Sequence, residues 1–594
     1  MCRVWVGMLV AITIALFLLA CAKVEPTPVP TGPIPATTIP PTSTPPPTVA
    51  PTVAPTAAPT PTPTTVVARL PAKGVNGGSL VVASSASFPH RDVHQSVQES
   101  LTSLGPGISY SRLLRLKTEP GQTQPNLSIE CDLCQSWTLT KDLTYEFKLR
   151  PDITWQDVPP VNGRLLTAQD LTFSYGRLGT PGWPNESLVS PFGEVSAISD
   201  GALSVKLSLP DADALLSLAD GHAKVVASET VEQFGDLKES PVIGTGPWTW
   251  EGPRAGGGSN FVRNDGYFEP GAPFLDELII KVVKDGDDAE FPGEGRLAAF
   301  LAGQVDVVDL PPRAWDRLGK SNLEFDSVMH LQAGSGLLLS FNLQDPFFAD
   351  EQMRKAVFRA IDPWDYVDTL WSGQGSVSTG MPVPGPDWLL SKDEIRTRHF
   401  ANPSQSRTLL QDANHGEPKE IQLTVWSESE NQIYSDLGEN IAEDLRAVDF
   451  DVAVRRLNPD QFRKTVMRPA RDFQLALGIL PPTTTPNGFL LALLHSEGRW
   501  NIANHTDYEL DAMIEAQAVD FNPDSRKKRL EEIQRHVLDR GYVFSPVTGA
   551  TRWAFRNGLK GFHPNAALSE YIHWSRVWMD PEATTLRRKP KVPR

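Results

Sequence analysis

The sequence predicts an α/β protein built from at least two packed lobes. The chain has 594 residues, and a single hydrophobic core rarely serves more than about 250 residues. Between residues 421 and 480, short apolar runs typical of strands flank a stretch with helical spacing. The strands are expected at 421–426, 450–454 and 473–480, and the helix carries Ile433, Leu437, Ile441 and Leu445 on one face. Strand, helix and strand in succession are typical of an α/β lobe.

The stretch from residue 131 to residue 177 carries the strongest local pattern. Apolar and polar side chains alternate along two short runs, and Lys141-Asp142 between them predicts a hairpin turn. A loop with several prolines follows. Thr167 then stands three residues before Asp170, which resembles a capping box at the start of a helix. This stretch therefore predicts a hairpin, a loop and a capped helix.

Composition excludes some functions. The formal net charge of −16 argues against a nucleic-acid partner, which requires a basic surface. The sequence holds neither a Gly-x-Ser-x-Gly elbow nor an HExxH motif, so we expect no enzyme. His90 and His94 have a spacing that a metal could use, but no third ligand is evident. We therefore expect no metal and no cofactor.

The chain begins with features of an exported protein. An apolar run follows Arg3 and ends at Ala20, which is short for a membrane span and fits a secretory signal. The sequence Leu18-Leu19-Ala20-Cys21 resembles a lipobox, where bacterial lipoproteins are acylated on cysteine. The alternative is an uncleaved N-terminal anchor. Both interpretations place the rest of the chain outside the cytoplasm, on the membrane surface.

A proline- and threonine-rich tract follows this signal segment. Its composition cannot bury a core, and proline favours an extended backbone. We therefore expect a disordered linker at residues 22–75 that lifts the folded part of the chain off the membrane, and its threonines could carry O-linked sugars.

Cys131 and Cys134 form a C-x-x-C pair. Outside the cytoplasm, such a pair favours a small local disulfide. A redox site and half of a zinc site remain alternatives, although no second pair follows at zinc spacing.

An ordered set of residues in the 131–177 stretch resembles the signature of the family 5 extracellular solute-binding proteins, the peptide, nickel and oligosaccharide receptors of ABC importers. The matching residues are Trp137, Tyr145, Phe147, Leu149, Arg150, Trp155, Asp157, Gly163, Thr167, Ala168, Asp170 and Ser174. A second block resembles the family between Phe341 and Gly373, and the similarity extends over roughly residues 78 to 580.

This resemblance implies a two-lobed periplasmic-binding-protein-like fold of type II, cluster C, with an extra small domain on lobe I. The expected divisions are a signal peptide with lipobox at 1–21, the linker at 22–75, lobe I with the inserted small domain at 76–332, lobe II at 333–545, and a C-terminal return to lobe I at 546–594. The implied function is a lipid-anchored, monomeric receptor that captures a peptide-like or oligosaccharide-like solute and delivers it to an ABC permease. The alternative is a ligand-sensing surface receptor of the same fold.

The resemblance also implies where the ligand binds. In peptide receptors of this family, a strand ending in G-W-x-x-D offers an Asp to the ligand's ammonium group. Here Ile479 occupies the Trp position, and the Asp position falls near Pro482. Because a buried ammonium without a counter-charge is costly, we expect an apolar, neutral or N-blocked solute. The alternative is that Glu428 or Glu430 supplies the charge.

The ligand-binding residues are expected on three segments between the lobes. The loop after the first strand and the ends of two strands of the second lobe supply them: Ser84, Ser85 and Phe88, then Trp426 and Ser427, then Ile479, Leu480 and Thr483. Trp426 could equally belong to the core.

Overall fold

The computed structural model of the chain describes residues 74–121, 126–414, 420–428, 432–467, 469–481, 483–565 and 567–583. The expected signal segment, Cys21 and nearly all of the linker lie outside the described residues. Within the described ranges, no helix combines the length and the apolar character needed to span a bilayer.

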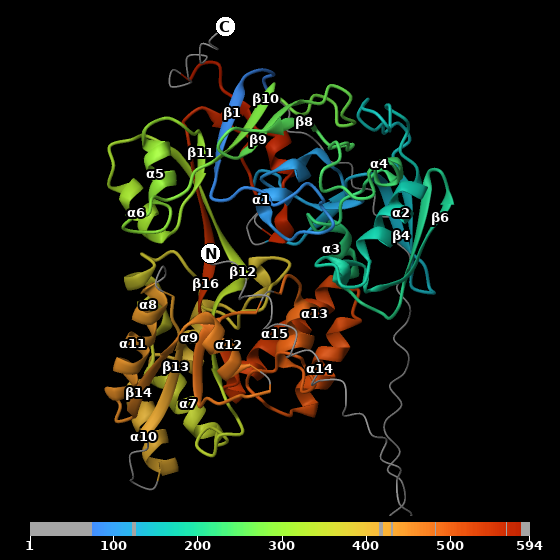
Figure 1. Cartoon of the computed structure of the whole chain (residues 1–594). Helices are drawn as coiled ribbons and strands as arrows, with labels where there is room; N and C mark the ends of the chain where they lie inside the picture. Colours follow the sequence, from blue (N-terminus) through green and yellow to red (C-terminus); the bar gives the residue numbers. More distant parts are fainter. Residues whose placement is uncertain are drawn as a thin grey trace, which may run out of the picture. The chain divides into compact units, whose positions relative to one another are not determined.

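One mixed sheet of ten strands is the central element of the fold (Figure 1). In spatial order, its strands are β14 (Asp451–Leu457), β13 (Glu420–Trp426), β15 (Leu475–Ile479), β12 (Asp326–Phe341), β16 (Val543–Phe555), β11 (Val307–Asp309), β1 (Ser79–Ser84), β10 (Glu277–Val282), β9 (Gly258–Arg263) and β8 (Trp248–Pro253).

The two halves of this sheet are joined through the antiparallel pair β12 and β16, here called the shared ladder. The first part of β12 pairs with the end of β16, whose other edge pairs with β11. The last part of β12 pairs with the start of β16 and, on its other edge, with β15. Both strands are long, sixteen residues in β12 and thirteen in β16, so each extends from one half of the sheet to the other. The expected lobe boundaries at 332/333 and 545/546 both fall within the two strands of the shared ladder.

The register of the shared ladder shifts between Gln332 and Leu337. Gly334 and Gly336 lie in this interval with φ of +82° and +99°. A Cβ atom on Gly336 would come within 2.2 Å of the Val547 carbonyl oxygen. Both the backbone conformation and the close approach therefore require glycine, as is typical at an irregularity in a sheet.

Helices of the second lobe pack on both faces of the β12–β15 half of the sheet. Two hydrophobic cores result, one holding Phe341, Phe358 and Phe400 and the other Trp426, Phe462 and Phe489. The helices are α7 (Glu351–Ala360), α8 (Pro363–Leu370), α9 (Lys392–His399), α10 (Pro403–Asn414), α11 (Gln432–Arg446), α12 (Pro459–Val466), α13 (Pro486–Phe489), α14 (Tyr508–Ala518) and α15 (Pro523–Arg540).

The first lobe holds the other half of the large sheet and a smaller one. Short helices α1 (Glu99–Thr102), α5 (Glu294–Leu301) and α6 (Pro312–Gly319) accompany the large sheet. The small domain is built on a four-stranded sheet with its own core, centred on Phe147, Trp155 and Tyr175. Its elements are β4 (Cys134–Leu139), β5 (Thr144–Leu149), β7 (Ala202–Leu207), β6 (Phe192–Ser199), α2 (Ala168–Leu178), α3 (Ala214–Ala219) and α4 (Ser228–Phe234). Two further hairpin pairs are β2 (Leu114–Leu116) with β3 (Ile129–Cys131), and β17 (Leu559–Lys560) with β18 (Trp578–Met579).

The strongest local predictions are confirmed in the small domain. The predicted hairpin is β4 paired with β5. The Asp170 carboxylate accepts a hydrogen bond from the Thr167 backbone N–H at 2.9 Å, so this side chain caps the start of α2. Cys131 and Cys134 form a disulfide between the end of β3 and the start of β4.

A group of buried charges lies where the small domain meets the C-terminal segment. Arg115 pairs with Glu130 at 2.8 Å, Asp132 at 3.1 Å and Glu269 at 2.5 Å, and its own side chain is fully buried. Burial opposes the charge of Arg115, yet these carboxylates raise its pKa well above the ordinary value. Arg115 therefore remains charged and holds three acids at one point.

The C-terminal segment completes this buried charge cluster. Glu570 pairs with Arg112 at 2.7 Å, and Arg576 pairs with Glu130 at 3.2 Å. Burial raises the pKa of Glu570, but Arg112 and backbone N–H donors outweigh it and hold the pKa below its ordinary value. These pairs join residues more than 440 positions apart in the chain.

Substitution of Arg115 by Met should destabilise the protein strongly, because three buried carboxylates would lose their common partner. Breaking a buried ion pair in this way costs about 3–5 kcal/mol. Urea denaturation followed by tryptophan fluorescence measures the loss. Arg398, whose pair with Asp539 is about half exposed, provides the control: Arg398→Met should cost no more than about 1 kcal/mol. Equal losses in the two variants would contradict the assignment.

Candidate functional site

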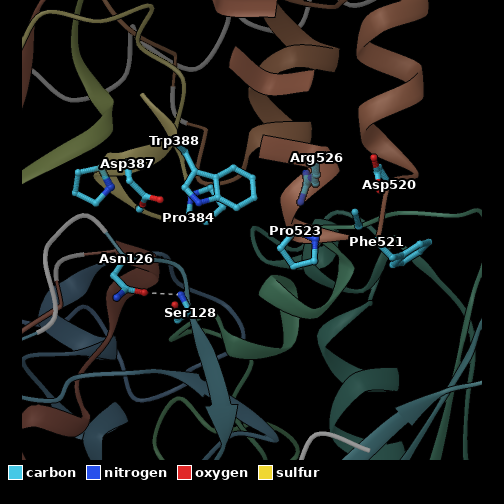
Figure 2. Close-up of a pocket in the computed structure, with 12 residues that line it drawn as sticks. Asn126, Ser128, Pro384, Asp387, Trp388, Asp520, Phe521, Pro523 and Arg526 are labelled. Atoms are coloured by element: carbon cyan, nitrogen blue, oxygen red, sulfur yellow. Dashed lines mark hydrogen bonds between the residues drawn. The ribbon is translucent and has the colours of Figure 1, made fainter. Parts of the chain in front are cut away.

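A cavity of about 480 Å³ lies between the two lobes, as Figure 2 shows. The first lobe contributes Asn126, Ser128 and Ala212, and the second lobe contributes two segments, 384–388 and 520–526. This volume lies within the range of small-ligand sites, about 300–1,000 Å³. The position and the size of the cavity suit a small solute held between the lobes.

The lining of this interlobe cavity combines apolar surface with a few charges. Trp388 and Phe521 both line the cavity, and three prolines add to its apolar surface (Figure 2). Asp387 and Asp520 bring carboxylates, each already in an ion pair, with Lys527 and Arg529 respectively. Such a site offers broad apolar contact with a small number of polar groups, as is usual for small-molecule sites.

Arg526 connects the two lobes beside the interlobe cavity. Its guanidinium donates to Asp213 of the small domain at 2.6 Å, and both side chains are buried. The same Asp213 accepts the backbone N–H of Asn487 at 2.7 Å. The Ala212 N–H donates to the Ala518 carbonyl at 2.8 Å. These contacts, here called the interlobe clasp, tie α15 and α13 to the segment that precedes α3.

A second, smaller cavity of about 70 Å³ lies on the first lobe, against the shared ladder. Thr551 and Trp553 of β16 form one side, and α1 and the C-terminal segment form the others. Asn565 lines this cavity and donates to the Asn126 carbonyl at 2.8 Å, while Asn126 lines the interlobe cavity. The two cavities therefore adjoin the same pair of asparagines.

The three residues expected after the first strand lie apart from both cavities. Ser84 is buried, and its hydroxyl donates to the Ala86 carbonyl in a local turn. Ser85 is exposed. Phe88 is half-buried and packs edge-on against Trp250 at 6.3 Å between ring centroids. These residues do not line either cavity described here.

The two residues expected at the end of β13 contact other residues of the second lobe and do not line either cavity. Trp426 is buried in a core of the second lobe, 5.4 Å from the Phe462 ring, and its indole N–H donates to Glu428 at 2.7 Å. Ser427 shares a hydrogen bond with Ser435 at 3.0 Å. Trp426 thus occupies the core position that was its alternative, and Glu428 is engaged with it.

The segment after β15 lies closer to the shared ladder. Ile479 pairs with Leu337 of β12, and the Leu480 side chain is buried in the core that also holds Trp426. Thr483 is half-buried; its hydroxyl lacks a hydrogen-bond partner, and its carbonyl lies against Gly334. Pro482 and Glu430 lie outside the described residues. This segment does not line the two cavities either.

The cavity residues carry little signal in the sequence. Phe521 and Arg526 stand at the start of α15, where Asn522 caps the helix through N–H donors of residues 524 and 525. The asparagine–proline pair at 522–523 marks a helix start, but it does not indicate that the neighbouring side chains meet the first lobe. Only the folded arrangement brings them to the interlobe cavity.

Substitution of Arg526 by Met should loosen the contact between the lobes, because Asp213 would lose its cation and Asn487 a donor. We expect a larger radius of gyration in small-angle X-ray scattering than for the unchanged chain. Arg529→Met serves as the control, because Arg529 pairs with Asp520 of the same lobe. A radius unchanged by Arg526→Met would show that the interlobe clasp does not restrain the lobes.

Comparisons with known proteins place the chain in a family. A model of the bacterial extracellular solute-binding proteins, family 5 (middle part), matches residues 128–501. The chain is 23% identical over 462 residues to the peptide transport periplasmic protein SapA of Salmonella typhimurium, covering 72% of this chain and 80% of that protein. It is also 23% identical over 528 residues to a probable di/tripeptide-binding protein 5 of Pseudomonas aeruginosa, covering 84% and 95%.

Among solved structures, HbpA2 from Haemophilus parasuis superposes with a TM-score of 0.69 at 17% identity, covering 85% of this chain and all of that one. The likeness shows the two-lobed type II binding-protein fold that the sequence predicted. The family is one of solute-binding proteins and not of enzymes, as expected. The chain belongs to the bacterial extracellular solute-binding proteins, family 5.

Proposed function

We propose that this protein captures a small solute between its lobes and delivers it to the membrane subunits of an ABC importer. The interlobe cavity is the observation that carries this proposal. Residues of both lobes line it, and the shared ladder is the sheet connection between those lobes. A ligand that contacts both walls would hold the lobes together, and domain closure around a ligand is a common binding mode.

The solute that the cavity fits best is peptide-like. Trp388 and Phe521 provide apolar surface for side chains, and the nearby asparagines and backbone provide hydrogen-bonding groups for amides. The names of SapA and of the di/tripeptide-binding relative both refer to peptides. An oligosaccharide-like solute, which would stack on the same aromatic side chains, is the second class to test.

The protein would act at the outer face of the cell membrane. The apolar run ending at Cys21 supports export and lipid attachment, and the proline-rich tract up to residue 75 supports a spacer between membrane and receptor. The acidic net charge fits an extracytoplasmic receptor without a nucleic-acid partner.

Binding of a solute should raise the melting temperature of the full chain purified in detergent. A ligand that binds only the native state at a hundredfold excess over Kd stabilises it by about 2.7 kcal/mol. Tri-alanine, N-acetyl-tri-alanine, maltotriose and a nickel–histidine complex cover the solute classes, and thermal unfolding followed by tryptophan fluorescence gives the readout. We expect a shift with a peptide probe. No shift with any of the four would contradict solute capture.

Replacement of Cys21 by Ala should release the protein from membranes without altering its binding. A lipid-modified cysteine would carry the anchor, so the variant should lose incorporation of labelled palmitate in the native host and move to the soluble fraction. Cys2→Ala provides the control, because Cys2 precedes the apolar run. Unchanged labelling and membrane association in Cys21→Ala would favour the uncleaved N-terminal anchor.

A further inference from the structure

The small cavity on the first lobe contains an acid without a cationic partner. Glu99 lines this cavity and is exposed. Its carboxylate accepts only long hydrogen bonds, from Ser569 at 3.4 Å and Ser103 at 3.5 Å. Within the part of the chain that the structure describes, Glu99 forms no ion pair, because the nearby His222 binds Asp220 at 2.7 Å. Desolvation raises the pKa of Glu99 more than His222 and the hydroxyl groups of Ser569 and Ser103 lower it.

The other acid of this cavity is compensated. Glu570 is fully buried, pairs with Arg112 at 2.7 Å, and accepts backbone N–H groups of residues 116 and 572, each at 2.8 Å. It belongs to the buried charge cluster and has no capacity for an incoming cation. The charge available to a ligand is therefore that of Glu99.

A buried histidine provides a second, independent indication of a ligand site. His573 lines the same cavity with only 4% of its surface exposed, yet neither ring nitrogen has a hydrogen-bond partner. Burial lowers its pKa to about 3, so the ring is neutral and keeps one nitrogen as an acceptor. A buried acceptor without a donor costs free energy, and an N–H group of a ligand would remove that cost.

Aromatic side chains complete this cavity. Trp553 and Trp574 meet edge to face with 6.0 Å between ring centroids, and both line the cavity. The Trp574 indole N–H donates a hydrogen bond to the Ser103 carbonyl at 3.1 Å, and this bond fixes the orientation of the indole ring. Aromatic faces attract organic cations, and an unpaired carboxylate adds a direct charge.

We propose that Glu99, His573 and the two tryptophans form a subsite for an organic ammonium group of the transported solute. A volume of about 70 Å³ admits such a group and not a whole ligand, so the rest of the solute would extend past Asn565 toward the interlobe cavity. This inference rests on the proposed capture of a solute. It revises the expectation of a neutral solute, because an acid far from residues 478–483 would supply the counter-charge.

Binding of matched peptides by calorimetry, with the full chain in detergent, tests the subsite. We expect tri-alanine to bind at least tenfold more tightly than N-acetyl-tri-alanine. Glu99→Gln should raise the Kd of tri-alanine by about tenfold to a hundredfold, the range for a hydrogen bond to a charged group, and leave the acetylated peptide unaffected. Glu146→Gln, which alters an exposed acid on β5, is the control and should change neither value.

Two further measurements are needed. One tests whether the ammonium group can come from a side chain as well as from a peptide N-terminus, and the other tests the role of His573. If N-acetyl-Ala-Lys-Ala binds with the same dependence on Glu99, the subsite accepts a side-chain ammonium as well as a peptide N-terminus. His573→Phe keeps an aromatic ring beside Trp574 and Phe562 but removes the acceptor. It should raise the Kd of tri-alanine severalfold at an unchanged melting temperature.

The possible failures can be told apart. Equal affinities for the free and the acetylated peptide, or a Kd unchanged in Glu99→Gln, would overturn the subsite and leave solute capture intact. Absence of binding by every peptide and by the sugar and nickel probes would overturn both proposals.

Discussion

The arrangement of the two lobes depends on the pairing of β12 with β16. These strands are the described elements of the large sheet that belong to both halves, with β15 attached on one side and β11 on the other. Their register breaks near Gly334 and Gly336, where the backbone conformation excludes other residues. A regular ladder resists bending, whereas an irregular one concentrates distortion at a few residues. The irregularity in the connection between the lobes is therefore fixed by these two glycines.

The two cavities differ in character, and of the two only the small one is lined by residues of the β12–β16 pair, Thr551 and Trp553 of β16. The interlobe cavity is wide, mostly apolar and lined by both lobes. The small cavity lies on the first lobe and carries the Glu99 carboxylate, which forms no ion pair among the described residues, and the His573 imidazole, whose two nitrogens have no hydrogen-bond partner there. A broad apolar site tolerates many side chains, while a small charged one selects a single functional group. Together, they would allow one receptor to accept varied solutes that share one charged end.

The fold followed from the sequence more readily than the site did. The alternation around Trp137 and Phe147 and the cap at Asp170 depend on neighbouring residues, so they could be predicted locally. The two-lobed architecture followed from family resemblance over the folded chain.

The candidate subsite could not be inferred in the same way, because Glu99 lies in α1 and His573 in the C-terminal segment, far apart in the sequence. Neither stands in a motif. Trp426, chosen from its place at a strand end, is buried because β13 is flanked by strands on both sides and covered by α12.

The buried charge cluster has a consequence for how the protein is made. Arg112, Arg115, Glu130 and Asp132 are synthesised early, but two of their partners, Glu570 and Arg576, come within the last 25 residues. Until that segment is present, Arg112 lacks Glu570 and Glu130 lacks Arg576, so the buried charge cluster is incomplete. The cluster is complete only when residues more than 440 positions apart in the chain have met.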